Sequence, residues 1–337
     1  MSDEFTVGIT GAAGYIGSRL LVEIEATHPD WNVVAVDNFY RGDVREAGGI
    51  TVQHCDVRNT DRLTELFEGV DAIVHLAAIS GLDDCADNPE LTHEVNVRAT
   101  NDLAWYCNET GAALVFPASM AIFGHPDQFP ITVDQPREPI NWYGRSKVLG
   151  ERAIETFAHG EFPAHVLVKS NLYGGHRVDD DYISKGTVIN FFLGRALDEE
   201  PITVYEPGTQ SRNFIHVVDV ARAYVASLEQ LQEQLAAGDT GVTTYPIASD
   251  EDPSVHAIAE EVQEIARAHD LDTAVKLVEN PRSGETMVEA FTVDTTNTHE
   301  ELGWEARRGV AAAIERRIDA QVTTSRATDR SRTPTSE

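Results

Sequence analysis

Tyr143 and Lys147 are the two residues of this chain whose types and spacing suit proton transfer most directly. Side chains four residues apart on a helix lie on the same face, one turn from each other. A free tyrosine has a pKa of about 10, and a nearby ammonium lowers that value because it stabilises the phenolate. Lowering it to about 7 takes roughly 4 kcal/mol, at about 1.36 kcal/mol per pKa unit. Because this spacing is common by chance, the pair is informative only together with the residues that precede it.

A glycine-rich turn near the start of the chain indicates a nucleotide-binding site. Residues 5–10 have the pattern of a short buried strand, and an amphipathic segment to about Ala26 follows the turn. Strand, glycine turn and helix together present backbone N–H groups and a helix N-terminus to a pyrophosphate. The glycines allow the tight turn, the approach of the phosphates and close helix packing, and they are Gly11, Gly14 and Gly17.

The second predicted strand, 33–36, ends in Asp37, twenty residues past Gly17. A carboxylate at this place accepts hydrogen bonds from the adenosine ribose hydroxyls and repels a 2′-phosphate. The sequence therefore predicts NAD as the cofactor. The positive charge of its nicotinamide ring would add to the effect of Lys147 on the pKa of Tyr143.

Strands and helices continue to alternate along the chain. Further strands are expected at 51–55, 72–76, 113–118 and 165–169, with helices between them. This alternation predicts an α/β fold with a doubly wound parallel sheet of the Rossmann type. Ligands of such sheets bind beyond the carboxyl ends of the strands. The sequence places four candidate site residues at these ends: Asp37, Asp56, Ala77 and Ser119.

Composition restricts the expected partners and compartment. The 26 basic and 56 acidic residues give a net charge of −30, and lysine occurs at only four positions. Such a surface repels nucleic acid and anionic membranes, so neither is expected as a partner. Because salt screens the self-repulsion of this charge, we expect a salt-rich cytoplasm, as in a halophile. Three further features of the sequence are those expected of a cytoplasmic protein. The three cysteines form no CxxC pair, and no apolar run reaches about 18 residues. The first predicted strand begins too early to leave room for a signal peptide.

Together these motifs resemble those of the extended short-chain dehydrogenases/reductases of the NAD-dependent epimerase/dehydratase family, from Phe5 to about Ile318. The GxxGxxG spacing of the glycines is the form typical of this family. Ser119, in Ala-Ser-Met-Ala-Ile-Phe-Gly, matches the family's catalytic serine or threonine and completes its triad with Tyr143 and Lys147. The resemblance implies that Tyr143 carries the proton, that Ser119 hydrogen-bonds the reacting oxygen, and that Lys147 holds the nicotinamide ribose.

The resemblance also implies which residues bind NAD and a nucleotide-sugar substrate. The expected NAD-binding residues are Gly11, Gly14, Tyr15, Ile16, Gly17, Asp37, Asn38, Asp56, Val57, Leu76, Ala77, Ala78, Asn96, Tyr143 and Lys147. The expected substrate-binding residues are Ser119, Asn171, Val188, Tyr205, Arg212, Arg282 and Glu285. Tyr205 would stack on the base, while Arg212 and Arg282 would grip the diphosphate. The twelve histidines show no HxxxH or HExxH spacing, so no catalytic metal is expected.

The family's organisation further implies domain boundaries and an oligomeric state. Residues 1–171 would form the NAD-binding domain, to which 213–242 return. Residues 172–212 and 243–320 would form a smaller C-terminal α/β substrate-binding lobe. Residues 322–337, rich in Ser, Thr and Arg without an apolar period, are expected to be a disordered tail. Members of the family commonly pair two helices per subunit in a homodimer, and 86–108 and 143–157 are the segments expected at that interface.

The two residues after Ser119 narrow the reaction. Dehydratases of the family carry Asp and Glu there, and decarboxylases of UDP-glucuronate usually carry a Glu two residues after the threonine. Here Met120 and Ala121 occupy these positions, and neither can move a proton. The expected reaction is therefore one that needs hydride transfer alone, epimerisation at C4 of a UDP-hexose. The alternatives are a net NAD-dependent sugar or nucleotide-sugar dehydrogenase, or another nucleotide-sugar-modifying member of the family such as a dehydratase or decarboxylase. A non-catalytic NAD-sensing module is disfavoured because the tyrosine–lysine pair is intact.

Overall fold

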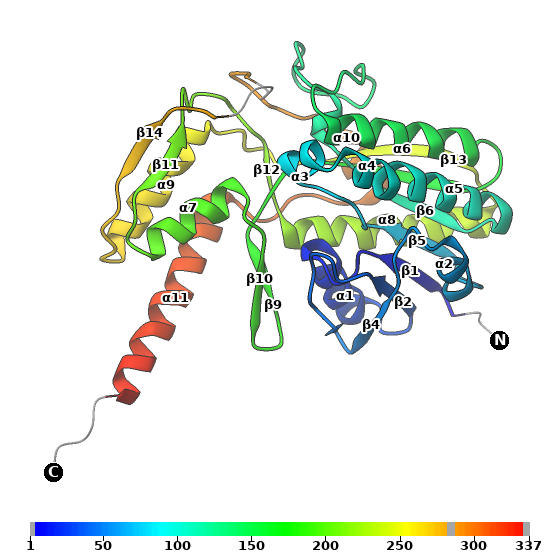
Figure 1. Ribbon diagram of the computed structural model, residues 1–337, viewed down its shortest axis with the longest axis horizontal. Coiled ribbons are helices and arrows are strands. Elements are labelled where there is room, and N and C mark those ends of the chain that lie inside the picture. Colours follow the sequence, from blue (N-terminus) through cyan, green and yellow to red (C-terminus); the bar gives the residue numbers. More distant parts are fainter. Residues whose placement is uncertain (1–3, 282–286, 333–337) are drawn as a thin grey trace.

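An eight-stranded sheet forms the centre of the protein, whose computed structural model describes residues 4–281 and 287–332 (Figure 1). The strand order is β13-β7-β6-β5-β1-β2-β4-β3, and all neighbours are parallel except the antiparallel pair β3–β4. This order and the parallel pairing confirm the predicted doubly wound Rossmann sheet. The strands are β1 (Thr6–Thr10), β2 (Asn32–Asp37), β3 (Glu46–Ala47), β4 (Ile50–His54), β5 (Ala72–His75), β6 (Ala113–Ser119), β7 (Pro163–Lys169) and β13 (Gly241–Ile247).

Helices cover both faces of this sheet, as its apolar strands require. On one face α1 (Tyr15–Thr27) and α8 (Val217–Ala237) pack together, and on the other face lie α5 (Ala99–Thr110) and α6 (Trp142–Ala158) (Figure 1). The short helix α2 (Thr60–Leu66) joins the second group through its contacts with α5. Successive residues of β6 enter different apolar clusters, Leu114 and Phe116 on the α6 side, Val115 on the α8 side. Each face therefore has its own core.

A smaller lobe packs around a core of its own. It contains the parallel pair β11 (Ile202–Tyr205) and β14 (Val275–Val278), with the helices α7 (Val188–Leu197), α9 (Val255–Ala268) and α11 (Val310–Arg332) around it. Apolar residues of all three helices meet in one cluster, among them Ile189, Ile258 and Ile314. Ser254 starts α9, because its Oγ accepts a hydrogen bond of 3.1 Å from the N–H of Ala257.

Two short strand pairs join the domain to the lobe. Strand β8 (Asn171–Tyr173), directly after β7, pairs in parallel with β12 (Phe214–His216), directly before α8. Between them the chain makes the antiparallel hairpin of β9 (Gly175–Val178) and β10 (Asp181–Ser184), which packs against α1. The chain thus leaves the large sheet after β7 and returns to it through β12, which places the small lobe beside the carboxyl edge of the sheet (Figure 1).

The structure corrects the predicted domain boundaries after residue 242. Strand β13 extends to Ile247 and pairs with β7, so 243–247 belong to the large sheet. Helix α10 (Thr296–Leu302) packs on α8 and β13, and the Trp304 indole N–H donates a hydrogen bond of 2.9 Å to the carbonyl of Asp219. The segment around 296–304 is therefore also part of the NAD-binding domain. Sequence periodicity did not reveal this because it reports which face of a helix is apolar and not which partner covers that face.

The expectation of a disordered tail from residue 322 is wrong as far as Arg332, where α11 ends. The segment 310–332 contains neither glycine nor proline, so no residue in it interrupts a helix. Residues 333–337 lie outside the described part of the chain. Within the described part, no helix is long and apolar enough to cross a membrane.

The remaining elements are short and lie between β5 and α5 or directly after β6. They are α3 (Leu82–Asp87), α4 (Pro89–Thr92), the π-helical turn η1 (His93–Arg98) and the 3₁₀ turn η2 (Met120–Ile122). A π-helical turn adds one residue to the helical repeat and is found most often at functional sites. Here η1 leads directly into α5 and carries Asn96, one of the predicted site residues.

Candidate active site

A cavity of about 1810 Å³ opens at the carboxyl edge of the large sheet, between the sheet and the small lobe. Its walls come from the glycine turn, from the loops after β2 and β5, from the ends of β6 and β7, and from 178–192 with parts of 203–212. Pockets for one ordinary ligand have volumes of about 300–1,000 Å³. This cavity is large enough for a dinucleotide and a second nucleotide together.

The glycine turn forms one end of the cavity and fits a pyrophosphate. Gly11 has a φ of 71°, and a Cβ on it would lie 2.5 Å from the backbone nitrogen of Ala77. A Cβ on Gly17 would lie 2.7 Å from Cα of Ala12. Helix α1 begins with Gly14 as its N-cap, and no side chain satisfies the N–H groups of its first turn. Bare backbone donors at a helix N-terminus are what a dinucleotide phosphate requires.

Two backbone hydrogen bonds hold Asp37 beside this turn. One oxygen of its carboxylate accepts a hydrogen bond of 3.1 Å from the N–H of Ala13, and the other accepts one of 2.7 Å from the N–H of Phe39. Burial raises the pKa of Asp37, and these backbone hydrogen bonds partly offset the shift. The backbone thus fixes the carboxylate at the cavity wall, where it can accept hydrogen bonds from ribose hydroxyls.

The predicted triad comes together on the same wall. Tyr143 lies in the first turn of α6, where Oδ1 of Asn141 accepts a hydrogen bond of 2.8 Å from the N–H of Gly144. Ser119, at the end of β6, lies close enough to Tyr143 for its hydroxyl to lower the pKa of the tyrosine. Lys147 is buried one turn further along α6, with Nζ 4.8 Å from the centroid of the Phe116 ring. All three triad residues line the cavity.

The surroundings of Tyr143 shift its pKa in the direction opposite to the expectation from the sequence. Burial raises the pKa of Tyr143 to about 12, and the nearby Ser119 hydroxyl offsets this in part. Burial also lowers the pKa of Lys147 to about 8. Desolvation of the phenolate therefore dominates the pKa of Tyr143 in the protein alone. The charge of the nicotinamide ring, on which the expectation also relied, comes with the cofactor.

This electrostatic balance gives a testable pH dependence. In NAD-free protein we expect the Tyr143 phenol to stay protonated until the pH approaches 12. Binding of NAD⁺ should lower that midpoint, because a positive charge nearby stabilises the phenolate. The phenolate absorbance of the wild type minus that of Tyr143→Phe isolates this residue, with and without NAD⁺. A midpoint that NAD⁺ leaves unchanged would contradict the assignment of Tyr143 to the nicotinamide site.

Most of the other predicted residues also line the cavity. On the cofactor side these are Gly11, Gly14, Tyr15, Ile16, Gly17, Asp37, Asn38, Val57, Leu76, Ala77 and Ala78, and on the substrate side Asn171, Val188, Tyr205 and Arg212. The predicted Arg282 and Glu285 lie outside the described residues.

The Tyr15 hydroxyl also has a structural role. It lies 2.9 Å and 2.8 Å from the carbonyl oxygens of Tyr173 and Gly174 and donates a hydrogen bond to them. It thereby ties α1 to the start of the second lobe.

Two predicted cofactor residues, Asp56 and Asn96, do not line this cavity. The carboxylate of Asp56 accepts hydrogen bonds from the side chains of Arg58 and Asn38, which hold its pKa below the usual range. Asn96 is buried, and its amide makes two hydrogen bonds of 2.8 Å with the backbone of Ile79 and one of 3.0 Å with Oγ of Ser146. Asn96 therefore positions the loop after β5 against the catalytic helix. These hydrogen bonds already use both donors of the Asn96 amide, and its contact with the cofactor stays a prediction.

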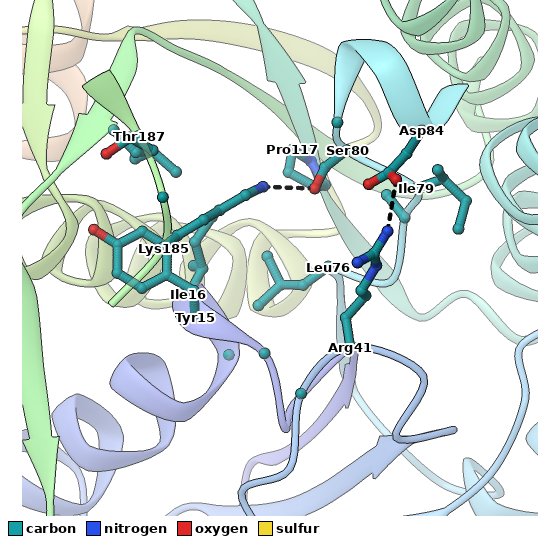
Figure 2. Close-up of a pocket in the computed structure, with 18 of the residues that line it drawn as sticks. Tyr15, Ile16, Arg41, Leu76, Ile79, Ser80, Asp84, Pro117, Lys185 and Thr187 are labelled. Carbon is teal, nitrogen blue, oxygen red and sulfur yellow. Dashed lines mark hydrogen bonds and ion pairs between the residues drawn. The ribbon is translucent and has the colours of Figure 1, made fainter. Parts of the chain in front are cut away.

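Two cavity-lining cations were missed in the sequence because loops bring them in from distant segments. Nζ of Lys185, between β10 and α7, donates a hydrogen bond of 2.7 Å to Oγ of Ser80 in the loop after β5. Arg41, in the loop after β2, pairs with Asp84 at 2.6 Å. Figure 2 shows both side chains extending across the cavity towards the loop 79–84. For Lys185, the scarcity of lysine in the sequence could have indicated a role at the site, since three of the four lysines line this cavity.

Comparison with known proteins agrees with this geometry. The model of the NAD dependent epimerase/dehydratase family matches residues 7–240. The chain belongs to this family. As a member it has NAD as its cofactor, and the glycine turn and Asp37 form the site that fits it.

Relatives span nearly the whole chain. The UDP-glucose 4-epimerase of Mus musculus is 28% identical over 340 residues, which cover 91% of this chain and 94% of that protein. The UDP-glucose 4-epimerase GEPI42 of Cyamopsis tetragonoloba is 26% identical over 338 residues, 92% of each chain. A solved structure of MoeE5 in complex with UDP-glucuronic acid and NAD has a TM-score of 0.76 at 26% identity, covering 96% of this chain and 99% of that one. A UDP-glucose-4-epimerase structure from Stenotrophomonas maltophila, with a TM-score of 0.82 at 24% identity over 96% and 99% of the two chains, shows the same fold.

Proposed function

We propose that this protein is an NAD-dependent nucleotide-sugar 4-epimerase acting on a UDP-sugar. The observation that carries the proposal is the end of β6, where Ser119 meets Tyr143 and the next two residues, Met120 and Ala121, line the cavity without an acidic group. This wall offers a proton carrier for the sugar hydroxyl at C4. Among the described residues of this wall, none beside Ser119 brings a carboxylate for elimination.

The residues divide the work of such a reaction between them. NAD⁺, when bound, would supply the hydride acceptor for C4 and the hydride donor for its return. Tyr143, as phenolate, takes the proton of the C4 hydroxyl and gives it back after the sugar has turned over in the site. Ser119 donates a hydrogen bond to the same oxygen and stabilises the charge that develops on it. Lys147 holds the nicotinamide ribose and, as a cation, favours the phenolate.

The second lobe supports the nucleotide part of the proposal. Tyr205, at the end of β11, and Arg212, just before β12, line the cavity from the small-lobe segment, and Asn171 in β8 lies where the two lobes join. A guanidinium pairs with phosphate oxygens and an aromatic ring stacks on a base. This division assigns one half of the cavity to NAD and the other to the nucleotide of the substrate.

Product analysis without added NAD tests the proposal. We expect the purified protein, in high salt, to convert UDP-glucose to UDP-galactose with resident NAD⁺ and without a rise in NADH absorbance. NADH that accumulates only when NAD⁺ is supplied, without an epimer, would favour the alternative of a net dehydrogenase. If neither product nor NADH forms, the same measurement on other UDP-hexoses decides whether the sugar or the reaction class was wrong.

We also propose that the protein is a homodimer and that it works in a salt-rich cytoplasm. The exposed Trp105 on α5 and Leu149 on α6 give the outer face of these contacting helices the apolar side chains that a homodimer interface would bury. Three buried free cysteines agree with a reducing cytoplasm. The net charge of −30 supports a salt-rich one, because salt screens its self-repulsion.

A further inference from the structure

Lys169 is a buried cation beside the catalytic serine, and the reaction described above gives it no task. It is the last residue of β7 and pairs in register with Ser119 at the end of β6. Only 7% of its surface is exposed, yet it lines the cavity. Adjacent strands lie about 4.8 Å apart. Lys169 therefore starts within one strand spacing of the group expected to hold the C4 oxygen of the sugar.

The described part of the protein gives Lys169 no anion. Its Nζ donates a hydrogen bond of 2.8 Å to the carbonyl of Ala118, and an ammonium has two further N–H donors. The described residues include no ion pair for Lys169, while Lys147 and Lys185 repel it. Burial and this repulsion lower the pKa of Lys169. Without an anion the neutral amine of Lys169 is therefore favoured, and a ligand that brings a negative charge would stabilise its ammonium form.

The location of Lys169 identifies where that charge sits on the ligand. The Tyr143 phenolate can balance only one cation, and Lys147 lies one turn from it on α6. The diphosphate of the substrate is assigned to Arg212 in the other half of the cavity. A negative charge beside Ser119 must therefore belong to the sugar ring itself. A carboxylate at C6 fits, because only C5 separates its carbon from C4.

We propose that Lys169 is a specificity-determining residue that binds the C6 carboxylate of a UDP-hexuronate, so that this site prefers a hexuronate to the neutral hexose. The inference rests on the proposed function for the placement of the sugar. It refines the substrate class of that same site. A charge-assisted hydrogen bond to a buried carboxylate gives a preference of about 10- to 100-fold.

Binding to a catalytically silent protein tests the inference without relying on turnover. In the full-length, NAD-loaded Tyr143→Phe protein, calorimetry should give a Kd for UDP-glucuronate about 10- to 100-fold lower than for UDP-glucose. Adding Lys169→Met should abolish that preference, and Lys169→Arg should restore part of it because the charge returns. Lys276→Met is the matched control. Lys276 is exposed in β14 and does not line the cavity, so the preference should remain.

Each other outcome decides against the inference. Equal dissociation constants for the two sugars overturn it, and so does a Lys169→Met change that weakens both sugars alike. The melting temperature of Lys169→Met is expected not to fall, since an apolar side chain replaces a buried amine that has no anionic partner among the described residues.

Turnover of the wild type separates this result from the proposed function. Epimerisation of UDP-glucose without a preference for UDP-glucuronate leaves the function intact and removes the inference. A preference that depends on Lys169, without any epimer of either sugar, removes the function and leaves the inference.

Discussion

Tyr143→Phe is expected to lower turnover about 10³-fold, because general acid–base catalysis contributes about 10²- to 10⁴-fold and phenylalanine carries no proton. The ring still fills its place at the start of α6, so the fold and the glycine turn are preserved. NAD should therefore bind with unchanged affinity. Turnover with UDP-glucose, and with UDP-glucuronate, together with NAD binding measured by calorimetry, checks both halves of this expectation.

Tyr106→Phe is the matched control for this change. The Tyr106 hydroxyl donates a hydrogen bond of 2.6 Å to the carbonyl of Phe67, away from the cavity. Its loss should lower stability by about 1 kcal/mol and leave turnover unaffected. Near-normal turnover in Tyr143→Phe would refute the assignment of Tyr143 as the proton carrier.

Gly17→Ala is expected to abolish tight NAD binding. The added Cβ would lie 2.7 Å from Cα and 2.8 Å from the carbonyl oxygen of Ala12, so the turn or the start of α1 has to move. Such overpacking costs about 1–3 kcal/mol of stability. Losing two N–H contacts to a charged pyrophosphate costs at least about 3 kcal/mol of binding, on the order of 100-fold in Kd. Calorimetric titration with NAD and a thermal melt measure the two effects.

Gly194→Ala is the matched control for Gly17→Ala, because it adds a methyl group to a helix away from the glycine turn. Gly194 lies within α7, and a Cβ on it would meet nothing within 4 Å. Alanine is favoured over glycine in a helix by about 1 kcal/mol, so this variant should be at least as stable as the wild type and bind NAD normally. If both alanine variants bind NAD equally, the glycine turn does not hold the pyrophosphate.

Relations between residues that are close in the chain were predictable. Gly11, Gly14 and Gly17 share one turn, Tyr143 and Lys147 share one helix face, and strand followed by helix repeats along the first half. Such short-range patterns determine the backbone that they form, so the Rossmann sheet, NAD and the triad could be expected from the sequence. Asp37 was predictable for the same reason, since it ends the strand that follows the first helix.

Relations between distant segments were not predictable in this way. Parallel pairing of β6 with β7 places Lys169 beside Ser119, fifty residues earlier in the chain. A hydrogen bond joins Lys185 to Ser80, 105 residues away, because the small lobe folds over the edge of the sheet. Packing on α8 and β13 likewise assigned 296–304 to the NAD-binding domain.

Burial is the other property that only the tertiary structure decided. The spacing of Tyr143 and Lys147 predicted a lowered pKa, but desolvation of the enclosed phenol raises it to about 12 in the protein alone. Asn96 was expected at the cofactor, yet its amide is buried and bonded to Ile79 and Ser146. The sequence by itself determined which groups this protein has for chemistry and their local order. The tertiary structure decided which of them face the cavity and how strongly water is excluded from each, because both depend on segments that meet only after folding.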